Sequence, residues 1–193
     1  MPETDTTLYP RVSQILEVAG LGFDPAGIPP ARLEYAQLRG TAVHRAIEYH
    51  HAGVLDESTL HPDVRPAFEG YLRFLEDTHH EPLLSELELV HPTYGFMGHP
   101  DRVGWLYGKR VILDWKVTDS FNFWPVAFQL AAYRLLWEAN YPEQLVQATF
   151  ALQLSPSTGK YQLRPVEAEK YSQTFLAALV VYRARQQMGR NGR

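Results

Sequence analysis

Residues 111–117 read VILDWKV, and this alternating run indicates the central strand of a β-sheet. Successive side chains of a strand leave opposite faces, so the odd-numbered positions of the run form one wholly apolar face. The opposite face carries Asp114 and Lys116 beside Ile112. Charged groups on a face that should be core or site are costly unless they are paired or bind a metal. The run therefore predicts a sheet, and its Asp–Lys pair alone fits an ordinary pair on an exposed sheet face as well as a chemical site.

Further strands are expected on both sides of this run. A two-residue period continues at residues 84–90, 96–106, 146–154 and 161–166. A turn at residues 107–109 would pair the second of these strands with the central run, and this pairing would place Asp101 beside Asp114. Glu86 and Glu88 would share one face of the first strand.

A period near 3.6 residues predicts helices around the strands. Their expected ranges are 9–20, 40–51, 64–78, 125–139 and 167–187. Ser13 is the expected N-cap of the first helix, which Gly20 would end, and Thr41 is the expected N-cap of the second. The Pro-rich residues 23–35 read as a turn. This order of elements predicts one domain over residues 1–193, with an α/β (α+β) fold in which helices flank a central mixed β-sheet.

Composition narrows the class of protein. The chain has 45% hydrophobic and 21% charged residues, which is typical of a soluble globular protein. No stretch approaches the roughly 20 apolar residues of a membrane span, and the N-terminal residues lack the pattern of a secretory signal, so a cytoplasmic location without membrane contact is expected. Cysteine is absent, which excludes thiolate zinc sites and cysteine-ligated iron–sulfur clusters. Any metal would have oxygen or imidazole ligands, which favours Mg²⁺ or Mn²⁺.

The net charge of −4 is unevenly distributed. From Arg164 onward six Lys and Arg residues stand against two Glu residues, so this end carries +4 and the remainder −8. A basic end could contact phosphates, and a solvated helix with a frayed tail explains the same pattern.

Three carboxylates and one ammonium are expected on one side of the sheet, from Glu86, Asp101, Asp114 and Lys116. Carboxylates can hold a hard divalent ion, and an ammonium can position or deprotonate a water and stabilise developing negative charge. Simpler interpretations stay open: Asp101 as a turn residue after Pro100, and the glutamates as a solvated strand face.

In this order the residues resemble the PD-(D/E)XK nuclease superfamily, in particular the RecB-like exonucleases common in phages. Pro100-Asp101 and Asp114-Trp115-Lys116 spell its motif. The run RGTAVH at residues 39–44 is similar to the family's early helix, and Ser85-Glu86 to the segment that carries an acidic residue. The downstream Q-x-x-x-Y helix is matched by Gln129 and Tyr133. The resemblance covers residues 9–140; His99-Pro100 before the aspartate, and Val117 after the lysine, depart from the usual pattern.

The resemblance implies a restriction-endonuclease-like core and a role for each matched residue. The implied metal ligands, for one or two Mg²⁺ or Mn²⁺ ions, are His44, Asp101, Asp114 and the carbonyl of Val117. Glu86 would be an additional site acid, and Lys116 would act on the attacking water as a base or as an electrostatic stabiliser. Gln129 and Tyr133 would brace the site or contact the DNA backbone, and ordinary helix packing is their alternative role. The implied activity is metal-dependent hydrolysis of single- or double-stranded DNA, exonucleolytic and leaving 5′-phosphates, in recombination, repair or processing.

Several alternatives remain open at this stage. The chain could be a catalytically inactive nucleic-acid-binding module of the same fold, or a metal hydrolase for small molecules. The chain could also form a homo-oligomer or act with a recombination protein as its partner. His44, Glu48 and His51 share a helix face that could hold zinc, and His99 could support Asp101 from the same strand face. Aromatic residues that could stack on bases or belong to the core are Trp105, Phe121, Phe123 and Trp124.

Overall fold

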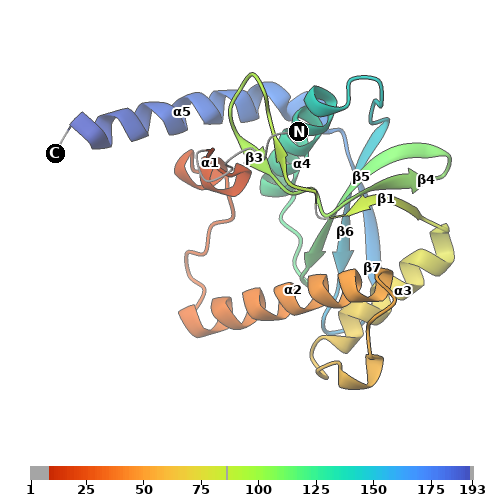
Figure 1. Cartoon of the computed structure of the whole chain (residues 1–193). Coiled ribbons are helices and arrows are strands. Elements are labelled where there is room, and N and C mark those ends of the chain that lie inside the picture. The colour runs from red at the N-terminus through yellow and green to blue at the C-terminus, as the bar shows by residue number, and fades with distance from the viewer. Residues whose placement is uncertain (1–8, 86, 192–193) are drawn as a thin grey trace.

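The computed structural model describes residues 9–85 and 87–191. A five-stranded mixed sheet forms the centre of the chain (Figure 1). In spatial order its strands are β1 (Glu81–Ser85), β4 (Arg102–Leu106), β5 (Lys109–Val117), β6 (Ala148–Leu154) and β7 (Tyr161–Val166). β5 and β6 are parallel, and the other neighbours are antiparallel. A small separate ladder pairs β2 (Leu89–Val90) with β3 (Met97–Gly98).

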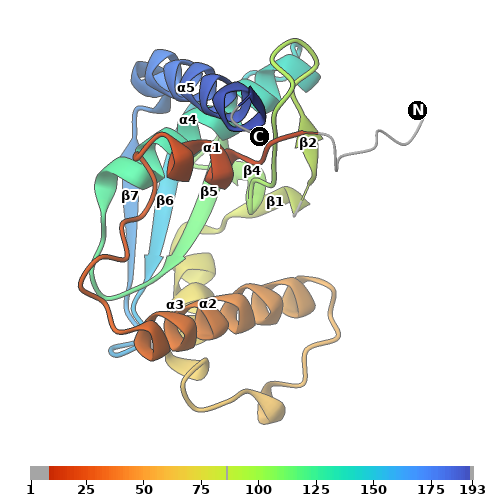
Figure 2. The same ribbon diagram turned by 90° about the vertical axis from the view of Figure 1, so that its left-hand side faces the viewer.

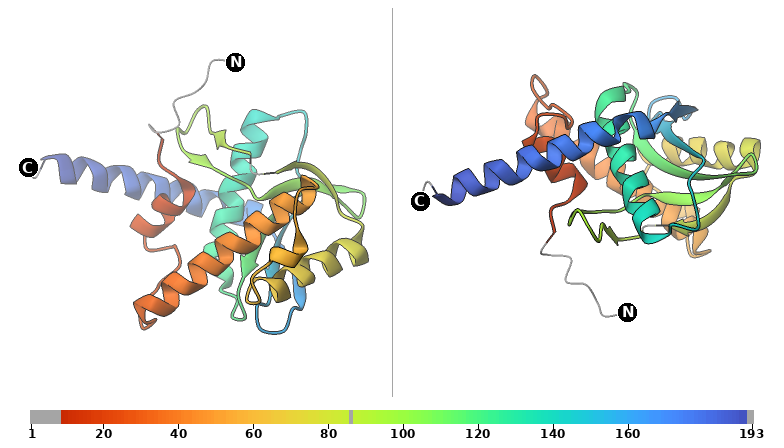
Figure 3. Two further views of the ribbon diagram at one scale, coloured as in Figure 1. Left: turned by 60° about the horizontal axis from the view of Figure 1, so that its bottom comes forward. Right: turned by 90° about the horizontal axis from the view of Figure 1, so that it is seen from above.

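Helices cover both faces of the sheet. On one face lie α2 (Pro30–His51) and α3 (Arg65–Thr78), with the short 3₁₀ helix η2 (Glu57–Thr59) between them in the chain. On the other lie α1 (Val12–Val18), α4 (Phe123–Asn140) and α5 (Ser172–Asn191), with the 3₁₀ turn η3 (Ala168–Tyr171) leading into α5. Figure 2 shows the two layers on opposite sides of the sheet, and Figure 3 shows that the C-terminal part of α5 extends away from it.

The alternation of β5 separates two apolar cores. Val111, Leu113 and Trp115 pack with residues of α2 and α3, whereas Ile112 packs with residues of α1, α4 and α5. The expected alternation of this strand is therefore confirmed, as is the expected mixed sheet flanked by helices. The parallel pairing of β5 with β6 requires a crossover, and α4 provides it.

Two predicted strands are interrupted. The strand expected at 96–106 is divided into β3 and β4, because residues 99–101 leave the ladder around Pro100, which has no backbone N–H to donate. The strand expected at 84–90 is likewise divided into β1 and β2. Glu86 lies outside the described residues, so its predicted face shared with Glu88 is not assessed.

The predicted helix limits need correction near the N-terminus. α2 begins at Pro30 and not at residue 40, because proline suits the first helical position and the turn predicted at 23–35 ends there. Thr41 is consequently inside α2, where its hydroxyl donates to the Gln37 carbonyl. The N-cap of α1 is Arg11 and not Ser13. The single helix predicted at 167–187 begins instead as η3 and continues as α5. No helix in the described part of the chain is long and apolar enough to cross a membrane.

Candidate active site

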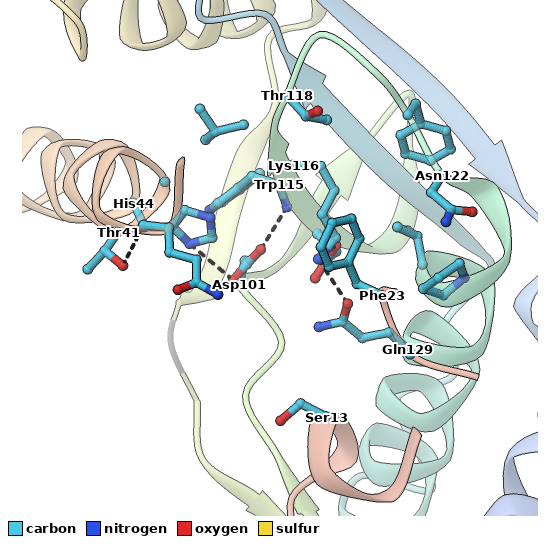
Figure 4. Close-up of a pocket in the computed structure, with 18 of the residues that line it drawn as sticks. Ser13, Phe23, Thr41, His44, Asp101, Trp115, Lys116, Thr118, Asn122 and Gln129 are labelled. Atoms are coloured by element: carbon cyan, nitrogen blue, oxygen red, sulfur yellow. Dashed lines mark hydrogen bonds and ion pairs between the residues drawn. The ribbon is translucent and has the colours of Figure 1, made fainter. Parts of the chain in front are cut away.

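A cavity of about 1020 Å³ lies where the carboxyl end of β5 meets α2 and the first turns of α4. Its polar lining includes the side chains that the sequence singled out: His44, Asp101, Asp114, Lys116 and Gln129. Figure 4 shows His44, Asp101, Lys116 and Gln129 converging from separate elements, with Phe23 from the loop before α2 also in the cavity. The predicted site residues therefore share one cavity, apart from Tyr133, which does not line it, and Glu86, which is not described.

Asp114 and Lys116 project from the same face of β5, as the two-residue period requires. The Asp114 side chain is only 1% exposed, and Lys116 Nζ lies 2.7 Å from its Oδ2. Despite this ion pair, Asp114 Oδ2 has no aligned hydrogen-bond donor among the described residues. A buried carboxylate oxygen without such a donor is costly, and it is a suitable ligand for a cation.

Asp101 is brought beside Asp114 by the pairing of β4 with β5. Arg102 pairs with Leu113, so the residue before β4 lies next to Asp114. The backbone N–H of Trp115 donates to Asp101 Oδ2 at 2.7 Å. This bond fixes the Asp101 carboxylate against β5, beside Asp114 in the cavity.

His44 reaches the same place from α2. Its Nδ1 lies 3.5 Å from Asp101 Oδ1. The neighbouring residues Val43 and Ile47 are buried in the core against the sheet, and this packing directs the helix toward the end of β5. Val117, the last residue of β5, lines the cavity as well.

Gln129 and Tyr133 hold Lys116 from the side of α4. Lys116 Nζ donates to Gln129 Oε1 at 2.8 Å, and Gln129 Nε2 donates to the Tyr133 hydroxyl at 2.7 Å. The two α4 residues are one helical turn apart, so this chain of contacts follows directly from their spacing. Tyr133 is also buried in the core with Leu130, so the contacts of the pair agree with bracing the site and with ordinary helix packing.

The two aspartates differ in their protonation behaviour. Burial, together with the nearby charge of Asp101, raises the pKa of Asp114 to about 6, although Lys116 acts in the opposite direction. Burial would also raise the pKa of Asp101, but His44, Lys116 and the Trp115 N–H together lower it. Burial would lower the pKa of His44, and the adjacent Asp101 raises it overall. The site therefore holds two close carboxylates whose mutual repulsion additional positive charge would relieve.

The donor set suits a hard divalent ion. Carboxylate oxygens and one imidazole are ligands for Mg²⁺ and Mn²⁺, and Asp101, Asp114 and His44 supply these groups in one cavity. Within residues 9–85 and 87–191, no group of three or more His, Asp or Glu side chains is already arranged around a metal position. The zinc site considered for His44, Glu48 and His51 has no such arrangement in this part of the chain either. His51 Nε2 instead contacts the Tyr71 hydroxyl.

Some residues considered from the sequence lie elsewhere. His99 pairs through Nε2 with Glu88 Oε2 at 2.8 Å and does not support Asp101. Trp105 pairs with Arg110, near the amino end of β5. Conversely, Phe23, Thr118 and Asn122 line the cavity, and no sequence pattern indicated them as site residues. Phe23 lies in a segment interpreted only as a turn, and no periodicity could have assigned it to a site.

Comparison with known proteins agrees with the fold. No protein-family model and no curated protein sequence matches this chain. A crystal structure of a candidate exonuclease from Eubacterium rectale aligns with 100% of this chain and 88% of its own, with a TM-score of 0.64 and 16% identity. An alkaline exonuclease from Laribacter hongkongensis covers 96% and 95% of the two chains at 15% identity, but its TM-score of 0.37 is too low to support an argument. The first likeness and the central mixed sheet confirm the predicted restriction-endonuclease-like fold class.

Proposed function

We propose that this chain is a metal-dependent nuclease that hydrolyses phosphodiester bonds in DNA. The observation that carries the proposal is the set Asp101, Asp114 and Lys116 in one cavity, with Lys116 Nζ held between Asp114 and Gln129. Two carboxylates that can hold a hard divalent ion and a fixed ammonium are the groups that metal-dependent phosphodiester hydrolysis needs. The fold shared with the Eubacterium rectale protein, itself described as a candidate exonuclease, supports the same conclusion.

Each site residue has a definite task in this proposal. Asp101, Asp114, His44 and the Val117 carbonyl would hold one or two Mg²⁺ or Mn²⁺ ions. A bound ion of this kind polarises the phosphate and makes a coordinated water more acidic. Lys116 positions the attacking water and stabilises the negative charge that develops on the phosphate. Gln129 keeps the ammonium in place, and Tyr133 keeps Gln129 in place. The products would be a 5′-phosphate and a free 3′-hydroxyl.

The finer assignments rest on the sequence resemblance to RecB-like exonucleases. The first assignments are exonucleolytic action and a role for Glu86 as an additional site acid. The proposed biological role is DNA recombination, repair or processing in the cytoplasm. The chain would act alone, as a homo-oligomer or with a recombination protein. DNA, in single- or double-stranded form, is the proposed substrate.

Digestion of end-labelled linear DNA, with Mn²⁺ or with EDTA, tests the proposal. The wild type should shorten the DNA only with Mn²⁺, Asp114→Ala should abolish the shortening, and Lys116→Ala should reduce it to a small residual rate. Lys109→Ala is a matched control, because Lys109 is an exposed lysine at the other end of the same strand. If the wild type leaves the DNA intact, or if Lys116→Ala digests it at the wild-type rate, the proposal is wrong.

An inactive nucleic-acid-binding module is the second candidate function. It is favoured by one observation, the lack of a ready three-ligand metal group among the described residues. Calorimetric titration with Mn²⁺ separates the two functions. A nuclease should bind Mn²⁺ and lose that binding in Asp114→Ala, whereas a module should bind DNA without binding Mn²⁺.

A further inference from the structure

A second cavity, of about 730 Å³, shares a wall with the candidate active site. Phe121 lines both cavities, so a molecule that extends past this ring from the first would enter the second. The second cavity lies between the start of α4 and β7, the strand at the edge of the sheet. Its lining residues are Phe121, Phe123, Gln162, Leu163, Arg164 and Pro165.

Arg164 is held in this cavity by neutral groups. Its Nε and Nη2 donate to Gln153 Oε1 at 3.0 and 2.8 Å, and Nη2 also donates to Gln162. Its guanidinium carbon lies 4.7 Å from the centre of the Phe121 ring. None of the ion pairs between described residues includes Arg164. The arginine is therefore a fixed cation that forms no ion pair with a described carboxylate, which suits a phosphate group.

Two exposed aromatic rings follow at the start of α4: Phe123 lines the second cavity, and the centre of the Trp124 ring lies 5.3 Å from that of Phe123. Trp124 is 57% exposed and Phe123 is 36% exposed. Trp124 is supported from behind by Phe128, at 6.1 Å between ring centres and 25° between planes, and by Tyr171, at 5.9 Å. A ring that is packed on one side and open on the other can stack on a flat ligand with little loss of side-chain freedom.

We infer that Phe121, Phe123, Trp124 and Arg164 form a subsite for single-stranded nucleic acid beside the active site. The aromatic rings stack on bases, and Arg164 contacts a backbone phosphate. The choice of a nucleic acid rests on the proposed nuclease function. Within that function, the shared Phe121 wall places the subsite on the path of a strand whose neighbouring phosphate is in the active site.

The chain contains a second pair of an exposed tryptophan and an arginine, and this pair lies away from the candidate active site. Trp105 is 37% exposed, and Arg110 lies 4.9 Å from the centre of its ring. The two are cross-strand partners near the amino end of β5, whereas the candidate active site is at its carboxyl end. An effect on nucleic-acid binding that depends on Trp124 and not on Trp105 therefore reports the subsite and not exposed tryptophan in general.

Fluorescence anisotropy in EDTA tests the subsite without cleavage. The probes are a fluorescein-labelled 12-nucleotide oligothymidylate and an abasic strand of the same length, which has the phosphates but no bases. The wild type should bind the oligothymidylate more tightly than the abasic strand, and Trp124→Leu should weaken the binding of the oligothymidylate alone, roughly 5- to 150-fold for one lost stack. Arg164→Gln should weaken the binding of both strands, and Trp105→Leu should change neither.

Thermal unfolding of each variant checks that it is folded, and Trp124→Phe, which keeps a stacking ring, should recover most of the affinity. The inference is overturned if the wild type binds the two strands equally, binds neither, or loses the same affinity in Trp105→Leu as in Trp124→Leu. Digestion of linear DNA with Mn²⁺ reports separately on the proposed function. If the wild type digests DNA but binds the oligothymidylate no more tightly than the abasic strand, only the subsite is refuted. If it prefers the oligothymidylate but does not digest DNA, only the nuclease proposal is refuted.

Discussion

Gln129 offers a quantitative test of how Lys116 is held. Replacement by methionine keeps the length of the side chain but removes the oxygen that accepts the Lys116 hydrogen bond at 2.8 Å. A hydrogen bond to a charged group contributes about 1.5–3 kcal/mol. If this bond serves the transition state, its loss lowers kcat by roughly 10- to 150-fold. The KM for DNA should change little, because Gln129 positions the lysine and does not bind the substrate in this mechanism.

Tyr133→Phe perturbs the same chain one step further from Lys116. The lost bond, from Gln129 Nε2 to the Tyr133 hydroxyl at 2.7 Å, joins two neutral groups and contributes only about 0.5–1.5 kcal/mol. The expected decrease in kcat is therefore about 2- to 10-fold. The matched control for Gln129→Met is Gln173→Met, because Gln173 is an exposed glutamine on α5, and this control should leave kcat unchanged.

The decisive assay is a double-mutant cycle on steady-state DNA cleavage with Mn²⁺. If Gln129 acts through Lys116, Gln129→Met should have no further effect once Lys116 is alanine. Independent effects that multiply in the double variant would refute the positioning role. An unchanged kcat in Gln129→Met would refute it as well.

Three further predictions concern stability, and thermal or denaturant unfolding measures each of them. Gly104→Ala should destabilise the chain by about 3 kcal/mol, because the new methyl group would overlap the Glu81 carbonyl across the β1–β4 ladder and lie 2.5 Å from His80 Cε1. Gly40→Ala, inside α2 with open space around it, should instead stabilise the chain by about 0.5–1 kcal/mol, and equal effects of the two substitutions would contradict the reasoning. Burial lowers the pKa of His80 from 6.5 to about 4, so the contribution of neutral His80 to the free energy of unfolding is complete above pH 6.5 and decreases as the pH falls toward 4, by about 3 kcal/mol at most. His80→Leu should therefore reduce the loss of stability between pH 6.5 and 4, and an unchanged loss would contradict this prediction. Asp114→Asn should have a higher Tm than the wild type in EDTA, because it removes one of two adjacent buried carboxylates. Mn²⁺ should raise the Tm of the wild type but not that of Asp114→Asn, and a lower Tm of the variant in EDTA would contradict this account.

Local periodicity predicted the parts of the fold in which one face of an element is buried. β5 is the best case, because its alternation separates two cores and thereby fixes which side chains meet which helix layer. The limits of α3 and of β7 were also close, since both carry clear periodic patterns. The start of α2 was missed because Pro29-Pro30 is a turn signal and a helix start at once, and only the structure decides between the two.

The candidate site was predictable in its residues but not in its contacts. The spacing of Asp114 and Lys116 indicated a shared face, and the turn at 107–109 indicated where Asp101 would lie. No local pattern could show that the Trp115 N–H binds Asp101, or that Gln129 accepts from Lys116, since these contacts join segments 14 and 13 residues apart. The proposed aromatic subsite depends on residues before and at the start of α4 sharing a cavity with β7, which is a tertiary property.

The choice of an amide at position 129 fits the proposed chemistry. Asp101 and Asp114 are each already in contact with a basic side chain of the chain itself, His44 for the first and Lys116 for the second. A divalent ion bound by both carboxylates would compete with these contacts, and Lys116 would then depend on its other partner. Gln129 offers a neutral oxygen, so it can hold the ammonium without neutralising its charge, whereas a carboxylate at this position would compensate that charge. The proposed mechanism needs the full positive charge of Lys116 directed at the phosphate, and Gln129→Glu should therefore lower kcat even though it preserves the length of the side chain and an acceptor oxygen.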